Sequence, residues 1–356
     1  MKHVASHIGA VTLVLGAALA AGCGGYHAGM PDRAQNLEAA TPSLPTAFAW
    51  TSSGVLVGPQ DDGDRRIVSV KDPSIVRFQD RWHLFATTAD AKGGWSMVYI
   101  NFADWADAAT APQYHLAHNP HLAGYHCAPQ VFWFAPQRKW YLIFQSQQPQ
   151  YSTTDDLTRP ETWTAPRNFF PVKPASVKDG WIDYWIIGGD THVYLFFTGD
   201  DGRFYRSRAA LDRFPEGMSD PVVVMQDPDK FHLFEAGATY RIKGRNLYLT
   251  IIEALGPNGV RYYRGFTADR LDGEWTPLAH TWEHPFAGSN NVTFGDGIEP
   301  WTQDISHGEL IRDGYDQTMT LDPANLQFLY QGRRPREGNV AYDQLPYRLG
   351  LLTLRK

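Results

Sequence analysis

The chain of 356 residues has only two cysteines, Cys23 and Cys127, and no block of basic residues. If Cys23 carries a lipid, Cys127 has no partner for an intrachain disulfide. The stability of the fold must then come from its hydrophobic core. The net charge of −6 is spread along the chain, which argues against nucleic acid as a partner. No apolar run after residue 21 is long enough to span a membrane.

Several common functional motifs are also missing from the sequence. It has no glycine-rich phosphate-binding loop and no cluster of histidines and cysteines spaced as metal ligands. It shows no long helical periodicity, which argues against an α-rich fold. Cys127 is more simply explained as a small buried apolar residue than as a nucleophile.

The N-terminus has the pattern of an export signal. Lys2 and His3 precede an apolar run over residues 8–21, which is too short to cross a bilayer. The run ends in small residues directly before Cys23, and this resembles a bacterial lipobox. We therefore predict a signal peptide over residues 1–22 and a lipid on the Cys23 sulfur, which begins the mature protein. The alternative is an ordinary signal peptide with a chance cysteine.

The rest of the chain divides into a tether and one large domain. Residues 23–43 are rich in alanine, glycine and proline and lack periodicity, so we predict a mobile linker there. We assign residues 44–356 to a single domain of short strands, because aromatic and β-branched runs alternate there with turn-forming residues.

Five of these runs have similar patterns and recur at long intervals. They begin at residues 82, 140, 193, 247 and 327. Recurrence on the scale of 40–50 residues or more in an all-β sequence is typical of propeller blades. We therefore predict a five-bladed β-propeller, in which residues 347–353 join a blade with the N-terminal region and close the ring. A β-sandwich is the alternative, but it explains the repeat less well.

Three acidic residues lie near the expected strand starts, namely Asp72, Asp183 and Glu235. The innermost strands of a propeller surround one channel, so these carboxyl groups can converge although they are distant in sequence. Pro73 should push Asp72 toward extended backbone, and Lys71 should favour its ionised form. Glu235 lies in an apolar run, where desolvation raises a carboxyl pKa. If the three acids instead lie on different faces, each has an ordinary structural role.

One ionised and one protonated carboxyl group are what glycoside hydrolysis requires. Asp72 suits the ionised role and Glu235 the role of general acid, with Asp183 orienting Glu235 and tuning its pKa. Glu253 and Glu309 compete for the acid role, and the residues alone do not rank them below Glu235.

Two further side chains have two interpretations each. His307 is either a structural histidine or a ligand of a metal or substrate, and no other ligand lies at suitable spacing. Trp95 belongs either to the core or to a platform for a sugar ring.

Eleven motifs closely resemble those of glycoside hydrolase family 62, the α-L-arabinofuranosidases. The resemblance runs from about residue 44 to the C-terminus and is carried by residues 48–54, 69–74, 128–130, 139–146, 150–153, 180–183, 224–228, 290–294, 304–309, 314–318 and 344–349. It implies a five-bladed propeller and removal of single arabinofuranosyl groups from arabinoxylan, and often from arabinan, with inversion.

The resemblance also implies roles for individual residues. Asp72 takes the position of the general base, Glu235 that of the general acid and Asp183 that of the third carboxylate. Other positions match the family pocket: Lys71, Gln145, His307 and Gln317 around the arabinose, and Trp95 and Tyr342 near the xylan cleft. No cofactor is expected to be required for the chemistry, but a structural calcium ion in the central channel, with His307 as a neighbour, is implied.

The sequence departs from the family pattern at two places. His126 and Cys127 stand where a smaller or differently charged pair is common, and Asp343 stands where an amide is frequent. We expect an exported, lipid-anchored monomer that acts on arabinoxylan or arabinan. The alternatives are an arabinanase or xylosidase of a related propeller family, and a surface-tethered sugar-binding propeller without catalysis. The presence of both Asp72 and Glu235 argues against the last.

Overall fold

The computed structural model describes residues 43–334 and 340–356, which belong to one compact unit, Thr41–Lys356. The predicted signal peptide, Cys23 and all of the predicted tether except Ser43 lie outside the described residues. Within the described ranges, no helix combines the length and apolar character needed to cross a membrane.

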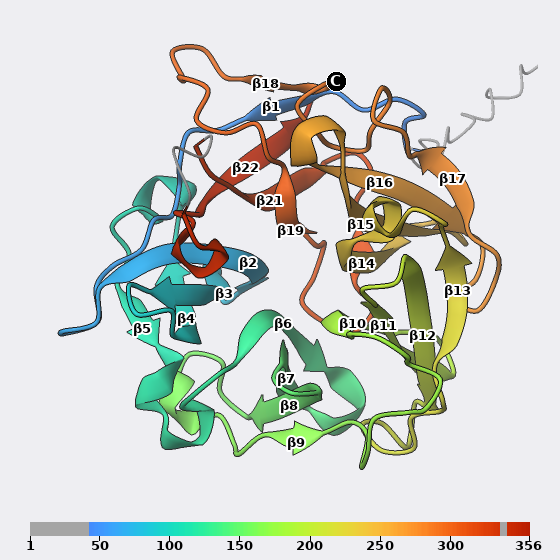
Figure 1. The fold of residues 1–356 in the computed structure, drawn as a ribbon. Helices are drawn as coiled ribbons and strands as arrows, with labels where there is room; N and C mark the ends of the chain where they lie inside the picture. The colour runs from blue at the N-terminus through green and yellow to red at the C-terminus, as the bar shows by residue number, and fades with distance from the viewer. Residues whose placement is uncertain (1–42, 335–339) are drawn as a thin grey trace, which may run out of the picture. The chain divides into compact units, whose positions relative to one another are not determined.

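Five sheets surround a common centre, which confirms the predicted five-bladed propeller (Figure 1). From the centre outward, the first sheet contains β2 (Ile67–Phe78), β3 (Arg81–Asp90), β4 (Trp95–Phe102) and β5 (Gln113–His115). The second contains β6 (Cys127–Phe134), β7 (Lys139–Gln145), β8 (Pro149–Thr154) and β9 (Arg167–Asn168). The third contains β10 (Ile182–Gly188), β11 (His192–Thr198), β12 (Arg203–Ala210) and β13 (Val222–Gln226).

The remaining two sheets have five strands each. The fourth contains β14 (Glu235–Ile242), β15 (Tyr248–Leu255), β16 (Arg261–Ala268) and β17 (Thr276–Ala279), with β20 (Thr320–Leu321) on the other side of β14. The fifth contains β19 (Ser306–Leu310), β21 (Gln327–Gly332), β22 (Arg348–Leu354), β1 (Trp50–Ser52) and β18 (Val292–Phe294).

The described residues contain no α-helix, and their helical segments are short 3₁₀ turns between strands. These are η1 (Trp105–Asp107), η2 (Leu116–His118), η3 (Pro120–Leu122), η4 (Ala135–Gln137), η5 (Pro160–Thr162), η6 (Lys230–Leu233), η7 (Pro257–Gly259) and η8 (Tyr342–Gln344).

The ring is closed by strands from both ends of the domain. In the fifth sheet, β1 pairs antiparallel with β22, so that Trp50 lies opposite Leu354. On its other edge β1 pairs in parallel with β18. This confirms the predicted pairing of residues 347–353 with the N-terminal region. The first and the last strand of the domain therefore lie side by side in one sheet.

The five recurring runs lie in β3, β7, β11, β15 and β21, which are the second strands of their sheets. Neighbouring blades bury both faces of such strands, which explains their continuous apolar character. The three acids lie instead on the innermost strands that come before them. Asp183 and Glu235 lie at the start of their strands, but the prediction that Asp72 begins its strand is wrong, because Asp72 lies in the middle of β2.

All five innermost strands carry a β-bulge at the same level. The pairing register shifts between residues 71 and 74, 127 and 130, 182 and 185, 235 and 238, and 306 and 308. At four of the bulges one non-glycine residue is left-handed: Asp72 (φ 50°), Ala128 (φ 49°), Asp183 (φ 56°) and Ala236 (φ 53°). The extended backbone expected for Asp72 is therefore wrong. A bulge re-aims side chains, here toward the channel axis.

A segment between β19 and β20 crosses the far ends of three innermost strands. Its carbonyl groups accept hydrogen bonds from Trp133 N of β6 to Tyr315 O (2.8 Å), from Gly188 N of β10 to Gln317 O (2.6 Å) and from Arg241 N of β14 to Met319 O (3.1 Å). We call residues 313–319 the crossing segment. It joins the second, third and fourth blades at the end opposite the bulges.

Candidate active site

A small cavity of about 160 Å³ lies at the level of the five bulges. We call it the central pocket, and it is lined by Lys71, Asp72, Trp95, Tyr125, Cys127, Ala128, Gln145, Ile182, Asp183, Glu235, His307 and Tyr342. Eight of the nine predicted catalytic and substrate-binding residues therefore meet in one place. They come from all five blades, which is what the propeller geometry predicts.

The bulges are held by hydrogen bonds that pass from blade to blade. Asp72 N donates to Gln331 Oε1 (2.7 Å), and Ala128 N donates to Thr87 Oγ1 (2.7 Å). Asp183 N likewise donates to Gln145 Oε1 at 3.4 Å, and His307 N to Glu253 Oε2 at 2.6 Å. Each acceptor lies on the second strand of the preceding blade, at the bulge level. Buried backbone donors of this kind need partners, so these side chains fix the ring around the pocket.

The link between the third and fourth blades is different. Thr198 occupies the equivalent position, but its buried hydroxyl has no hydrogen-bond partner among the described residues. Instead, Ala236 N donates to Asp183 Oδ2 (2.8 Å). Since Ala236 directly follows Glu235, the Asp183 carboxylate fixes the backbone that carries Glu235. This is consistent with the orienting role predicted for Asp183.

Asp72 lies between a lysine and a histidine. Its Oδ2 is 4.0 Å from Lys71 Nζ, and its Oδ1 is 3.3 Å from His307 Nδ1. His307 Nδ1 is also 3.7 Å from Asp183 Oδ2. Burial lowers the pKa of His307, but the charges of Asp183 and Asp72 outweigh it and raise that pKa above its ordinary value.

Burial raises the pKa of Asp183 to about 6, with the charge of His307 opposing the rise and those of Glu235 and Asp72 adding to it. The central pocket thus contains carboxyl groups in different settings. Asp72 has Lys71 and His307 as neighbours, whereas desolvation penalises the ionised form of Asp183. Different environments for neighbouring acids are the usual basis for different catalytic roles.

Glu235 is in contact with Arg261, a residue that the sequence analysis did not single out. Arg261 Nη1 touches carboxylate oxygens of both Glu235 and the fully buried Glu253, and these two charges raise the pKa of Arg261 against the opposing effect of burial. Arg261 therefore holds the Glu235 side chain from behind. Its only sequence signal is a charge inside a strand, which is too common to indicate a role.

The two competing acids lie outside the central pocket. Burial raises the pKa of Glu253 to about 7, with Arg261 opposing, and its carboxylate accepts hydrogen bonds from Ser306 and His307. Glu309 is fully buried deeper in the channel, where it pairs with Arg312 at 2.6 Å and accepts a hydrogen bond from Ser74. Of the three candidates, Glu235 is the one that lines the pocket, so the geometry favours it as the acid.

One wall of the pocket is a cation–aromatic cluster. Lys71 Nζ lies 3.9 Å from the ring centre of Trp95 and 4.7 Å from that of Tyr342. The two rings stack at 5.9 Å, and the Tyr342 hydroxyl is 3.3 Å from Lys71 Nζ. Tyr342 is 46% exposed, so this wall continues from the pocket to the surface. Such a rim suits the predicted contact with a polysaccharide chain.

Cys127 and His126, which together form the first departure from the family pattern, lie in different surroundings. Cys127 lines the pocket and is 3% exposed, and burial raises the pKa of its thiol to about 12, so it remains protonated and unreactive. His126 is buried against the ring of Phe144 rather than in the pocket lining. Tyr125, which the sequence analysis missed, completes the wall and its hydroxyl accepts a hydrogen bond from Gln145 Nε2 (3.0 Å).

Gln317 does not lie with the other predicted residues. It belongs to the crossing segment, and its Oε1 accepts a hydrogen bond from Ala135 N (3.0 Å), just beyond the far end of β6. The bulge of β6 lies at the other end of that strand, at Ala128. The prediction that Gln317 surrounds the arabinose is therefore not supported by this arrangement, in which its side chain anchors the crossing segment.

The calcium ion in the central channel stays a prediction. Calcium takes six to eight oxygen ligands, whereas His307 offers nitrogen, and its Nδ1 already faces Asp72 and Asp183. Over the described ranges, no three side chains of His, Cys, Asp or Glu gather in a metal-binding arrangement. A calcium ion in the channel would therefore need backbone, amide or water oxygens for most of its ligands.

Comparison with known proteins gives a consistent assignment. The family model "Glycosyl hydrolase family 62" matches residues 49–353. Alpha-L-arabinofuranosidase C of Cellvibrio japonicus is 41% identical over 357 residues, which is 98% of this chain but 55% of that protein. The chain thus spans about half the length of this curated relative.

Solved structures agree with the match. The catalytic domain of a Coprinopsis cinerea α-L-arabinofuranosidase of this family is 47% identical, with a TM-score of 0.84 over 87% of this chain and 98% of that one. An α-L-arabinofuranosidase from Podospora anserina in complex with cellotriose is 45% identical. Its TM-score is 0.83, and the match covers 88% of this chain and 98% of that one. A family member in complex with xylotriose is 43% identical. Its TM-score is 0.82, and the match covers 86% of this chain and 98% of that one. The chain therefore belongs to glycosyl hydrolase family 62.

Proposed function

We propose that this protein is an exo-acting, inverting glycoside hydrolase that releases single α-L-arabinofuranosyl side groups from arabinoxylan, and from arabinan as a second substrate. The observation that carries the proposal is the convergence of Asp72, Asp183 and Glu235 in one small pocket. A cavity of about 160 Å³ suits one terminal pentose better than an internal stretch of chain. Membership of the family and the named activities of similar proteins support the removal of α-L-arabinofuranosyl groups, and the xylotriose complex of a family member supports a xylan backbone.

In the proposed reaction, Asp72 accepts a proton from a water molecule, which attacks the anomeric carbon of arabinose. Glu235 donates a proton to the glycosidic oxygen, and the xylan hydroxyl leaves. Lys71 and His307 keep the Asp72 carboxylate between two positive groups, and Asp183 fixes the backbone beside Glu235. Arg261 positions the Glu235 carboxyl group. These two carboxyl groups and water complete the chemistry without a cofactor.

Arabinose release from wheat arabinoxylan, measured by chromatography, tests the proposal against its alternatives. An arabinanase would give arabino-oligosaccharides from debranched arabinan, and a xylosidase would give xylose. A sugar-binding propeller would bind the polymer and release no sugar. Each of these outcomes would contradict the proposed activity.

Inversion makes a stereochemical prediction. An inverting site leaves room for water, so its two carboxyl groups stand roughly 6.5–9.5 Å apart. Proton NMR in the first minutes of hydrolysis of an α-linked arabinofuranoside should therefore show the β-anomer before mutarotation. If the α-anomer appears first, direct attack by water is wrong and a glycosyl-enzyme intermediate must form.

We also propose that the protein is exported and held at the cell envelope by lipid on Cys23, and that it acts as a monomer, since one chain supplies every side chain of the central pocket. Lipoproteins carry several acyl chains, and more than one chain is needed for stable anchoring. Cys23→Ser should therefore move the protein from the membrane fraction to the soluble fraction, or leave it unprocessed. A Cys127→Ser variant is the matched control and should stay in the membrane. Equal membrane retention of Cys23→Ser and the parent would exclude the anchor.

A further inference from the structure

A second and larger cavity opens at the other end of the innermost strands. We call it the far pocket; its volume is about 490 Å³, and it shares no lining residue with the central pocket. Phe78, the last residue of β2, lies six positions beyond Asp72, and Trp133 of β6 lies five beyond Ala128. At about 3.3 Å per residue, these offsets place the two pockets roughly 15–20 Å apart along the strands.

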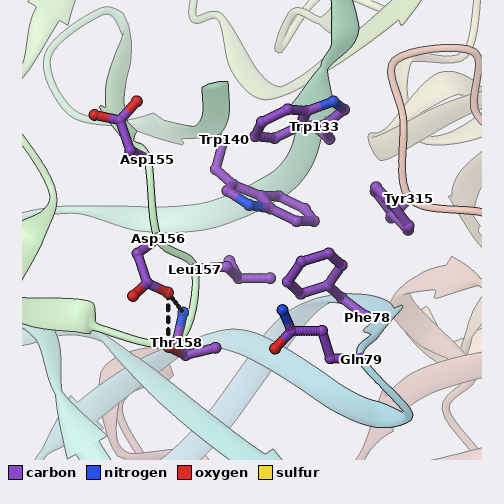
Figure 2. A pocket seen from close by; sticks show the side chains of 9 residues that line it. All are labelled: Phe78, Gln79, Trp133, Trp140, Asp155, Asp156, Leu157, Thr158 and Tyr315. Atoms are coloured by element: carbon purple, nitrogen blue, oxygen red, sulfur yellow. Dashed lines mark hydrogen bonds between the residues drawn. The ribbon is translucent and has the colours of Figure 1, made fainter. Parts of the chain in front are cut away.

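Four aromatic rings form one side of the far pocket (Figure 2). Trp140 is almost fully buried and lies 5.1 Å from Phe78, 5.5 Å from Trp133 and 5.4 Å from Tyr315 between ring centres. Tyr315, from the crossing segment, is 36% exposed, while Phe78 and Trp133 are half-buried. The rings therefore form a platform with a buried base and an accessible edge.

Polar groups without partners surround this platform. Among the described residues, the indole N–H of the half-buried Trp133 takes part in no hydrogen bond. By contrast, Trp50 and Trp185 donate theirs to backbone carbonyl groups. Figure 2 shows Gln79 beside Phe78, and within the described ranges its amide also makes no hydrogen bond. Donors and acceptors are thus left available around an aromatic surface.

The opposite side of the far pocket is acidic. Asp155 pairs with Lys139 at 2.9 Å, and Asp156 uses one oxygen, Oδ1, to accept hydrogen bonds from Thr158. The hydrogen bond from the Thr158 hydroxyl is the main reason that the pKa of Asp156 is lowered, so this carboxylate is charged at neutral pH. Its second oxygen remains free to accept a hydrogen bond. An anionic ligand would be repelled by the Asp156 charge.

The backbone at the edge of the far pocket is unusual. Gln79 and Asp80 form the turn between β2 and β3, and both are left-handed, with φ of 49° and 58°. Such turns normally contain asparagine and glycine. A non-glycine residue held in this conformation is strained, and such positions are concentrated at active sites and ligand-binding sites. The turn presents the Gln79 amide beside the rings.

We propose that the far pocket binds a segment of the neutral xylan backbone, as a second site for the polymer on the face opposite the central pocket. A polyhydroxylated pyranose chain matches both parts of the lining, because its C–H faces pack on the aromatic rings and its hydroxyl groups bond the indole, amide and carboxylate groups. This inference rests on the proposed function. A polymer held at a second site raises the local concentration of side groups at the first.

Trp133→Ala and Tyr315→Ala test the site through polymer retention. In native gels containing soluble arabinoxylan, both variants should bind roughly three- to tenfold more weakly than the parent, as expected for the loss of one stacked ring. Tyr315→Phe keeps the ring and should bind like the parent. The kcat and KM values on 4-nitrophenyl arabinofuranoside should be unchanged in all three, because this substrate is too short to reach the far pocket.

A direct measurement keeps the proposal testable if a variant does not fold. With ¹⁵N-labelled tryptophan in the parent, xylohexaose should shift the Trp133 indole resonance, which is identified by its loss in Trp133→Phe. No shift, or a shift with tetramethylammonium chloride and not with xylohexaose, would overturn the proposal. Gel retention and NMR do not depend on turnover, so absence of arabinose release would refute the proposed function without deciding on the far pocket.

Discussion

Replacement of Asp72 by asparagine should abolish release of arabinose from both arabinoxylan and 4-nitrophenyl arabinofuranoside. An amide cannot accept the proton of the attacking water, and general-base help of this kind is worth on the order of 10²–10⁴-fold. Because every substrate needs the water, kcat/KM should fall by similar factors for both. Initial rates of arabinose and 4-nitrophenolate release measure the two effects.

Two controls accompany the Asp72 experiment. Asp64 is exposed and lies outside the central pocket, so Asp64→Asn makes the same chemical change without an expected effect on either rate. Asparagine keeps the shape of the Asp72 side chain, so an unchanged melting temperature should show that the variant is folded. Substantial activity in a folded Asp72→Asn variant would remove Asp72 from the role of base.

Replacement of Glu235 by glutamine should have a selective effect. A xylan hydroxyl is a poor leaving group and needs a proton, whereas 4-nitrophenolate leaves with little protonation. The rate on arabinoxylan should therefore fall by on the order of 10²–10⁴-fold, and the rate on the aryl substrate much less. Comparing kcat/KM of the variant on both substrates gives the selectivity directly.

The buried acids provide the comparison for Glu235. Glu253→Gln removes a charge behind Arg261, and Glu309→Gln removes the partner of Arg312 deeper in the channel. Neither residue lines the central pocket, so neither variant should show the selective loss. Equal losses on both substrates in Glu235→Gln, together with a selective loss in one of the other two, would transfer the acid role to that residue.

The fold was predictable because the apolar run that recurs in the sequence forms a buried strand in every blade. Second strands such as β3 and β7 are covered on both faces, so each forms a continuous apolar run that stands out in sequence. The bulges were not predictable. They depend on hydrogen bonds that backbone N–H groups of the bulges donate to side chains in the preceding blade. One example is the bond from Asp72 N to Gln331 Oε1, between residues separated by most of the chain.

The candidate site was largely predictable from acids near the expected strand starts together with family motifs, although Asp72 lies in the middle of its strand. Gln317 was misplaced because a motif match carries no information about which end of the channel a segment reaches. Arg261 was missed because its role comes from contact with Glu235 and Glu253 on two other strands of the same sheet. Contacts of this kind appear only when the strands are paired.

The crossing segment has a kinetic consequence for the proposed reaction. Together with the buried pair of Glu309 and Arg312, it occupies the end of the channel below the central pocket. Water must then enter, and arabinose must leave, through the same opening that the xylan chain covers. Each cleavage therefore has to be followed by lifting of the polymer from that opening. Release of the covering polymer, and not the chemical step alone, should therefore set part of the time between successive cleavages.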